Sequence, residues 1–193
     1  MAQLFANNTI GPDYAEQLRK EHDGSKWGTT GARYSGAAVA ELIKSRPYLQ
    51  TALDYGCGKG TLAQAFDSLE WAEYDPGIPG KDTVPSGRFD LVTNTDVLEH
   101  VEREKLPAVL KELAAKTAKV LFLDIACYPT GKLFGEGPYK GEDLHLVIEK
   151  PEWWKAFVLD IIEPELQLAE YNAISKLSKG KYKDRCLMVL ERV

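Results

Sequence analysis

Cysteine is scarce in this sequence, with three thiols among 193 residues. Cys57, Cys127 and Cys186 are odd in number and widely separated, so they provide neither a disulfide framework nor the close spacing of a metal-ligand set. We therefore expect reduced thiols, and we expect no metal site in the chain.

Long apolar runs are also lacking. No run approaches the roughly 20 residues that a membrane-spanning helix needs. Residues 1–10 do not have the basic and then apolar layout of a signal peptide. From both absences we expect a cytoplasmic protein that does not enter a membrane.

An excess of positive charge is missing as well, because 24 Lys and Arg stand against 29 Asp and Glu, for a formal net charge of −5. Binding to nucleic-acid duplexes depends largely on clustered Lys and Arg, so we expect no nucleic-acid partner. The one basic cluster is typical of a solvated turn and comprises Lys176, Lys179, Lys181 and Lys183.

The size of the chain and its 44% of hydrophobic residues indicate a single domain over residues 1–193. Helices are predicted at residues 14–22, 37–45, 62–66, 107–116 and 151–160, and strands at residues 51–55, 71–74, 89–93, 120–125, 166–171 and 186–190. This alternation indicates an α/β fold: a Rossmann-like, doubly wound, mostly parallel sheet with a C-terminal antiparallel strand pair and helices on both faces. Ligands of such sheets bind beyond the carboxyl ends of the strands.

The loop after the first predicted strand carries a glycine motif, DYGCGKG, at residues 54–60. The motif does not match the dinucleotide-binding fingerprint G-x-G-x-x-G/A, because Thr61 stands at the sixth position from Gly56, where glycine or alanine is needed. A phosphate-binding P-loop fails because Leu53 stands where it needs glycine. The acid Asp54 would repel a pyrophosphate, but it would attract a ligand that carries an ammonium and a sulfonium group, as S-adenosylmethionine (SAM) does.

A second acid, Asp75, ends the next predicted strand 21 residues after Asp54. A ribose-binding carboxylate is expected about 20 residues on, and its two oxygens can accept from both ribose hydroxyls. Together with residues 87–101, GRFDLVTNTDVLEHV, these features resemble the class I SAM-dependent methyltransferases that act mostly on small molecules. The resemblance covers residues 53–125 well and the last two strands by layout only.

The resemblance implies where the cofactor would lie. Asp54 would face its ammonium, Asp75 would hold the ribose, and residues 94–96 would close over the amino acid and adenosine. The implied cofactor-binding residues are Asp54, Tyr55, Gly56, Cys57, Gly58, Gly60, Asp75, Pro76, Asn94, Thr95 and Asp96. Family members usually have a helix and a strand between the second and third predicted strands, but residues 76–88 contain three prolines, so we expect both to be missing. Residues 81–84 are our expectation for the adenine wall.

Two histidines are candidates for the acceptor side of the site. His145 is the first choice for a general base that takes a proton from an acceptor hydroxyl, and His100 is the second. Each has a structural alternative, since His145 could simply point to water and His100 could fix its loop against the sheet. His22 is expected to be solvated, and Cys57 to be a small residue tolerated between two glycines rather than a nucleophile.

Aromatic side chains are predicted to shape the acceptor pocket. The candidate substrate-binding residues are Trp27, Tyr34, Tyr128, Tyr139 and Trp153. Trp154 recurs at helical spacing with Phe157 and Val158, so it is expected in the core. The resemblance further implies an N-terminal helical lid, residues 1–48, on a Rossmann-like core of residues 49–193.

The leading hypothesis is transfer of a methyl group from SAM to an oxygen, nitrogen or sulfur atom of a small-molecule acceptor. The sulfonium is already activated, so the protein mainly has to hold donor and acceptor in line. Two alternatives stay open: a SAM-binding module that regulates or scaffolds without methyl transfer, and an NAD-dependent oxidoreductase, which Thr61 disfavours. The acceptor's identity and the oligomeric state are left open.

Overall fold

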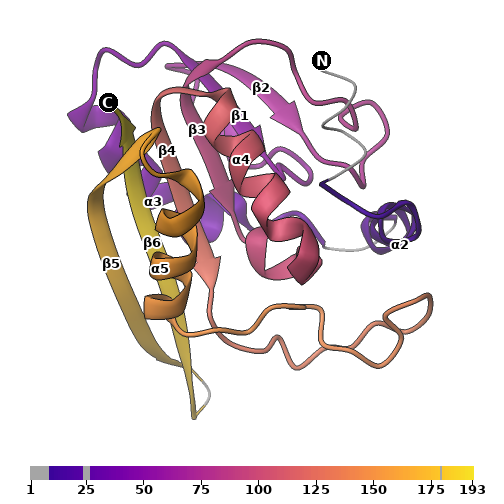
Figure 1. The fold of residues 1–193 in the computed structure, drawn as a ribbon. Helices are drawn as coiled ribbons and strands as arrows, with labels where there is room; N and C mark the ends of the chain where they lie inside the picture. Colours follow the sequence, from indigo (N-terminus) through magenta and orange to yellow (C-terminus); the bar gives the residue numbers. More distant parts are fainter. Residues whose placement is uncertain (1–8, 24–26, 179) are drawn as a thin grey trace.

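A six-stranded, mostly parallel sheet forms the centre of the computed structural model, which describes residues 9–23, 27–178 and 180–193 (Figure 1). Its strands are β1 (Thr51–Tyr55), β2 (Glu70–Tyr74), β3 (Phe89–Thr95), β4 (Thr117–Ala126), β5 (Leu166–Ser178) and β6 (Lys181–Arg192). Their order in the sheet is β2-β1-β3-β4-β6-β5. Strands β1 to β4 are parallel, and β6 is antiparallel to both of its neighbours. The predicted fold class is confirmed.

The sheet is doubly wound, because the chain passes from β1 to β2 on one side and then returns to β3 on the other side of β1. Strand order therefore reverses between β1 and β3, whose carboxyl ends lie at Tyr55 and Thr95. In parallel sheets this reversal point is where ligands bind, so it positions the site described below.

Helices cover both faces of the sheet. Helices α4 (Leu106–Lys116) and α5 (Pro151–Ile162) lie on one face, and α3 (Gly31–Ser45) lies on the other (Figure 1). Successive side chains of a strand point to opposite faces of the sheet, so the apolar side chains are divided between the two faces. Leu53 of β1 packs in the cluster of α4 and α5, whereas Ala52 packs in that of α3. Both α4 and α5 have proline in the first turn, where its missing N–H is tolerated.

Helix α2 (Pro12–His22) lies beside the sheet, near the long segment that links β4 to α5 (Figure 1). Its Tyr14 forms a small third apolar cluster with Phe134 of that segment. The N–H of Gly11, just before the helix, donates to the Glu102 carboxylate at 2.8 Å. The N-terminal segment is thereby anchored at the end of the sheet where the strands β1 and β3 terminate.

Two helices differ from their predictions in type or extent, whereas the others differ by at most two residues at one end. Instead of a helix at residues 62–66 there is one 3-10 turn, η1 (Ala63–Ala65), because the single buried apolar side chain of Leu62 is too little to stabilise a longer helix. Helix α3 begins at Gly31, six residues before the predicted start. Burial of side chains such as Ser35 against the sheet outweighs the low helix propensity of its glycines.

The connection from β2 to β3 is short, and residues 75–88 contain neither a helix nor a strand. The expected loss of one helix and one strand at this position is confirmed. Two further 3-10 turns follow β3: η2 (Leu98–His100) and η3 (Arg103–Lys105). Every helix in the part of the chain that the structure describes is too short or too polar to cross a membrane.

The C-terminal hairpin is longer than predicted, with 13 residues in β5 and 12 in β6. The sequence predicts strands only at residues 166–171 and 186–190. The additional residues are mostly polar and exposed, so they give no alternating pattern, but backbone pairing continues to Ser178 and Lys181.

The basic cluster lies on this extension of the hairpin. Lys176 and Lys183 face each other across the ladder, so the predicted solvated turn is wrong for these two residues. Lys179 and residues 1–8, on which predictions also fell, lie outside the described residues.

Candidate active site

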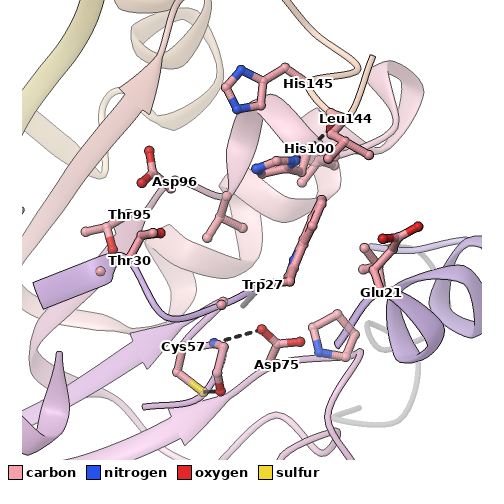
Figure 2. Close-up of a pocket in the computed structure, with 18 of the residues that line it drawn as sticks. Glu21, Trp27, Thr30, Cys57, Asp75, Thr95, Asp96, His100, Leu144 and His145 are labelled. Carbon is pink, nitrogen blue, oxygen red and sulfur yellow. Dashed lines mark hydrogen bonds between the residues drawn. The ribbon is translucent and has the colours of Figure 1, made fainter. Parts of the chain in front are cut away.

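A cavity of about 470 Å³ opens at the carboxyl ends of the parallel strands (Figure 2). Its wall combines the N-terminal segment, the loops after β1, β2 and β3, the segment after β4, and the β5–β6 hairpin. The predicted site residues that line it are Trp27, Tyr34, Asp54, Tyr55, Gly56, Cys57, Gly58, Asp75, Pro76, Thr95, Asp96, His100, Tyr128 and His145. The structure thus brings candidates for both the cofactor and the acceptor into one cavity.

The glycine loop after β1 is fixed by close backbone contacts. Gly56 and Gly58 have positive φ values of 84° and 52°. A side chain at Gly58 would put its Cβ 2.5 Å from the Cα and the carbonyl oxygen of Gly28, and one at Gly56 would collide with Val97. Glycine is therefore required here both by the backbone conformation and by the space available.

Asp75 lies at the end of β2 with both carboxylate oxygens engaged. Its Oδ2 accepts from the Gly58 N–H and its Oδ1 from the Gly77 N–H, each at 2.9 Å. The Nε2 atom of His22 lies 3.5 Å from Oδ1. The prediction that His22 is solvated is wrong, because docking of α2 over the loop leaves its side chain only 9% exposed.

Asp54 is buried at the end of β1 and accepts a hydrogen bond from the Thr93 hydroxyl at 3.0 Å. Burial raises the pKa of its carboxyl to about 7, although the bond from Thr93 opposes the shift. The charge that attracts a cationic ligand is therefore not permanent at this position, as the sequence alone suggests, but is sensitive to pH near neutrality.

The loop after β3 contributes in two different ways. Thr95 and Asp96 line the cavity, and Asp96 has a positive φ of 55°. Asn94 does not line it, because its side-chain amide is fully buried and donates to the Tyr55 carbonyl at 2.9 Å. Gly60 also lies outside the lining, where its lack of a side chain leaves room for the Glu73 carboxylate.

The two candidate histidines lie side by side, with ring centroids 4.7 Å apart. Nδ1 of His100 is 2.7 Å from the Leu144 carbonyl, and Nδ1 of His145 is 2.6 Å from the Tyr128 carbonyl. Because a carbonyl only accepts, both Nδ1 atoms carry the proton and both Nε2 atoms keep a lone pair.

Burial favours the neutral form of both histidines. Burial lowers the pKa of His100 to about 4, with a further contribution from His145, and burial also lowers the pKa of His145. His145 is only 7% exposed, so the alternative that it points to water is wrong. His100 ties its loop to Leu144 of the segment before α5, rather than to the sheet as its alternative held, and it also lines the cavity.

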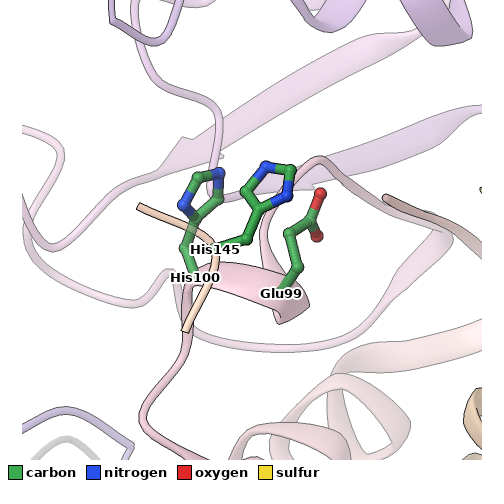
Figure 3. A group of neighbouring side chains, drawn as sticks. All are labelled: Glu99, His100 and His145. Carbon is green, nitrogen blue, oxygen red and sulfur yellow. The ribbon is translucent and has the colours of Figure 1, made fainter. Parts of the chain in front are cut away.

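Glu99 lies beside these rings, next to that of His145, and sequence reasoning did not select it (Figure 3). The side chain is fully buried, and its Oε1 accepts from the Ala126 N–H at 3.0 Å. Burial raises the pKa of this carboxyl well above its ordinary value, and the charge of Asp96 adds to the rise. The signal was present in the sequence, because Glu99 directly precedes a candidate histidine.

Of the five predicted substrate-binding aromatics, two lie outside the cavity. The Tyr139 hydroxyl donates to Glu102 at 2.7 Å, while its ring packs 5.0 Å from the ring of Tyr14. Trp153 stacks on Phe157, with ring centroids 4.7 Å apart, and packs against the main apolar cluster rather than the cavity. Its helix faces the sheet rather than the cavity, which the helical periodicity of α5 alone could not show.

The core and thiol predictions agree with the structure. Trp154 is fully buried in the core, as its helical spacing indicated. Cys57 is buried, and burial raises the pKa of its thiol, so a thiolate nucleophile is disfavoured here.

The hairpin and the segment after β4 supply cationic residues, and sequence reasoning missed the two from the hairpin, Lys183 and Arg185. Lys132 and Lys183 line the cavity, and the Lys183 Nζ lies 4.9 Å from the centre of the Tyr128 ring. Arg185 bridges two acids, since its guanidinium donates to Asp96 at 2.6 Å and to Asp124 at 2.7 Å. Only the pairing of β6 in the sheet brings Lys183 and Arg185 to the site.

A family model described as a methyltransferase domain matches residues 27–158. The chain belongs to this methyltransferase family. The predicted resemblance is thereby confirmed, and the residues matched run from the N-terminal wall of the cavity to α5. No curated protein matches the sequence of this methyltransferase.

Solved structures share the fold of this methyltransferase across nearly its whole length. The 1,6-didemethyltoxoflavin N1-methyltransferase of Burkholderia thailandensis, with bound substrate and S-adenosylhomocysteine, is 15% identical, with a TM-score of 0.61 over 93% of this chain and 89% of that chain. The magnesium protoporphyrin IX methyltransferase of Synechocystis, with bound S-adenosylhomocysteine, is 16% identical, with a TM-score of 0.58 over 100% and 99%. The N-methyltransferase NodS of Bradyrhizobium japonicum is 12% identical, with a TM-score of 0.53 over 93% and 98%. At these identities the likeness establishes the shared fold.

Proposed function

We propose that this methyltransferase transfers a methyl group from SAM to an oxygen, nitrogen or sulfur atom of a small-molecule acceptor. One observation carries the proposal: a single cavity has the glycine loop with Asp54 and Asp75 on one wall and two neutral histidines on another (Figure 2). Its volume of about 470 Å³ lies within the range of small-molecule sites, about 300–1,000 Å³.

The cofactor side suits a cationic nucleoside. Gly56, Cys57 and Gly58 line the cavity, so the methionine part can lie along their backbone, and the ionised Asp54 carboxylate would pair with its ammonium. Asp75 already accepts two backbone N–H groups, and each carboxylate oxygen has capacity for a further bond from a ribose hydroxyl. Solved structures of the same fold contain S-adenosylhomocysteine, the product of SAM after methyl transfer.

The acceptor side suits activation of a small polar molecule. His145 and His100 each direct a ring with an unprotonated Nε2 toward the cavity, and His145 is our first candidate for the group that activates the acceptor. Tyr34 and Tyr128 give this side an aromatic wall, while Lys183 gives it positive charge. The larger part of the acceleration comes from holding the methyl carbon and the acceptor atom in line.

The N-terminal segment acts as a lid in this proposal. Gly28 packs on Gly58 of the cofactor loop, and the Lys59 N–H donates to the Gly28 carbonyl at 2.8 Å. His22 and Trp27 of the same segment line the cavity, so exchange of cofactor requires this segment to move. The formal charge of −5 further supports an enzyme without a nucleic-acid partner.

Calorimetric titration tests the cofactor assignment. The parent chain is expected to bind SAM and S-adenosylhomocysteine but not NAD, and replacement of both acids (Asp54→Asn with Asp75→Ala) is expected to weaken that binding strongly. Equally tight binding by the double variant contradicts the proposal. Release of S-adenosylhomocysteine across a panel of hydroxyl, amine and thiol acceptors then separates an enzyme from a SAM-binding module without methyl transfer.

A further inference from the structure

Three side chains with metal-ligating atoms converge at the acceptor end of the cavity (Figure 3). Glu99 and His100 are neighbours in the turn η2, and His145 comes from the segment before α5. One nitrogen from each ring and one oxygen of the carboxylate lie within 4.8 Å of one another. Atoms that bind one ion at about 2.0–2.1 Å lie about 3.3 Å apart. Compared with the separation of up to 4.8 Å here, each pair of atoms has to approach by about 1.5 Å or less, which side-chain rotation can provide.

The histidines are already oriented as metal ligands are. Metal-ligating histidine almost always donates its other ring N–H to a carbonyl or a carboxylate, which fixes the tautomer and the direction of the ring. Here the Leu144 carbonyl holds Nδ1 of His100 and the Tyr128 carbonyl holds Nδ1 of His145. Both Nε2 lone pairs are thereby left available, and both rings line the cavity.

The carboxylate of Glu99 supplies an independent observation. The side chain is 0% exposed, its Oε1 accepts from Ala126, and its Oε2 has no hydrogen-bond partner among the described residues. A buried carboxylate oxygen without a partner is costly, and a cation beside it removes that cost.

The charges around the cluster also favour a cation. Glu99, Asp96 and Asp124 are three carboxyl groups, and Arg185 is the guanidinium paired with two of them. Arg185 balances only one of the two carboxylates, Asp96 and Asp124, that it bridges, so a divalent cation placed between Glu99 and the rings would be attracted rather than repelled.

We propose that Glu99, His100 and His145 bind one divalent transition-metal ion, Zn²⁺ or Mn²⁺, with open coordination positions facing the cavity. Two imidazoles and one carboxylate form a ligand set with vacancies for a substrate oxygen, and the two nitrogen ligands disfavour Ca²⁺ and Mg²⁺. This site departs from the sequence expectation of no metal, which considered the spacing of the cysteines only.

The ion defines the acceptor class, and this part of the inference rests on the proposed methyl transfer. An alcohol or phenol oxygen bound to the ion loses its proton to solvent more readily, because the cation stabilises the resulting anion. The oxygen then forms a bond to the methyl carbon, while the electron pair of the breaking carbon–sulfur bond stays on sulfur to give S-adenosylhomocysteine. His145 activates the acceptor here as a ligand of the ion, not as the base itself.

Metal titration of the full-length chain tests the site without cofactor or acceptor. After treatment with a chelator and its removal, Co²⁺ is added as the probe, and binding is followed by calorimetry and by the visible absorption of the ion. The parent is expected to take up about one equivalent. Two single variants test the cluster, Glu99→Gln, which keeps the oxygen that accepts from Ala126, and His145→Asn. Each is expected to weaken Co²⁺ binding about tenfold or more.

The matched control is His22→Asn, which removes the chain's other histidine and is expected to bind Co²⁺ as the parent does. Circular dichroism checks that each variant is folded, and His100→Asn serves if one of the others is not. The site is contradicted if the parent takes up no equivalent of Co²⁺, if the folded cluster variants bind as tightly as the parent, or if His22→Asn weakens binding as much as they do.

Two further measurements separate this inference from the proposed function. SAM binding by the metal-free parent tests the cofactor site alone, so its absence would contradict the proposed function and leave the ion site standing. Conversely, methyl transfer to a hydroxyl acceptor that continues at full rate in chelator would contradict the metal's role while supporting methyl transfer. Restoration of activity by Mn²⁺ or Zn²⁺ is the expected result.

Discussion

The two ends of the cavity are built by different means. The cofactor end is made of residues close together in the sequence, 54–58 and 75–77, and it uses the backbone as much as side chains. The acceptor end gathers His100, His145 and Lys183 from three distant parts of the chain, and it uses side chains. Under the proposed function, a local motif therefore binds the cofactor, whereas the sheet topology and its long connections assemble the acceptor end.

The largest expected effect comes from the acceptor end. His145→Ala is expected to lower kcat by about 10²–10⁴-fold, because it removes the group that activates the acceptor. The Kd for SAM is expected to stay within about twofold, since the ring lies away from the glycine loop. Steady-state kinetics with calorimetry on the same preparations checks both quantities, and unchanged turnover removes His145 from the mechanism.

The corresponding change at the cofactor end is Gly58→Ala. A side chain there collides with Gly28 and requires a residue that tolerates a φ of 52°. If this strain amounts to about 3 kcal/mol, the variant is expected to bind SAM about 100-fold more weakly. Calorimetric titration measures the two Kd values.

The matched control for that variant is Gly80→Ala. Gly80 also has a positive φ, 86°, but a Cβ added to it would meet nothing within 4 Å among the described residues, and it does not line the cavity. Its SAM affinity is expected to equal that of the parent. If both substitutions weaken SAM binding equally, the close approach of Gly28 is not what the loop requires.

Acidification is expected to have a smaller effect, which is confined to SAM binding at the cofactor end. Because the pKa of Asp54 is about 7 in the free protein, SAM binding that needs its carboxylate is expected to be about tenfold tighter at pH 8 than at pH 6. Asp54→Asn is expected to bind SAM more weakly and with little change over this range. A parent affinity that is flat from pH 6 to pH 8 would show that the ammonium is not held by this group.

The same group affects stability with a defined sign. Between about pH 4 and pH 7 the folded protein keeps the Asp54 proton that the unfolded chain has released, so the free energy of unfolding falls as pH rises through this range. As pH rises through this range, the Tm measured without SAM is expected to decrease less for Asp54→Asn than for the parent.

The smallest functional effect is expected outside the cavity. Trp153→Leu removes a ring that stacks on Phe157, so it is expected to lower the free energy of unfolding by about 1 kcal/mol while kcat/KM stays unchanged. Tyr128→Leu, in the cavity wall, is expected to raise KM for the acceptor instead. Kinetics on both variants checks this contrast, and a raised KM for Trp153→Leu would place that residue back at the substrate.

The sequence predicted the cofactor end in more detail than the acceptor end for a physical reason. Positive φ at Gly56 and Gly58 and acids at two strand ends are local requirements, so they leave a readable pattern. Lys183 reaches the cavity, and Arg185 reaches Asp96 in its wall, only through pairing of β6 with β4 and β5, which no short pattern encodes. The two misplaced aromatics, Tyr139 and Trp153, failed for the same reason.

The fold was predictable to a similar degree. Strands β1 to β4 and helices α4 and α5 alternate with clear apolar periods, so their existence and order follow from the sequence. The long polar hairpin and the early start of α3 do not, because pairing and packing rather than local propensity decide them.

A crystal structure with S-adenosylhomocysteine bound tests the division of the cavity most directly. We predict that the amino acid part lies along Gly56 to Gly58, that the ribose hydroxyls bond to Asp75, and that the sulfur faces His100 and His145. A ligand whose sulfur faces away from both histidines, or one bound outside this cavity, would contradict that division.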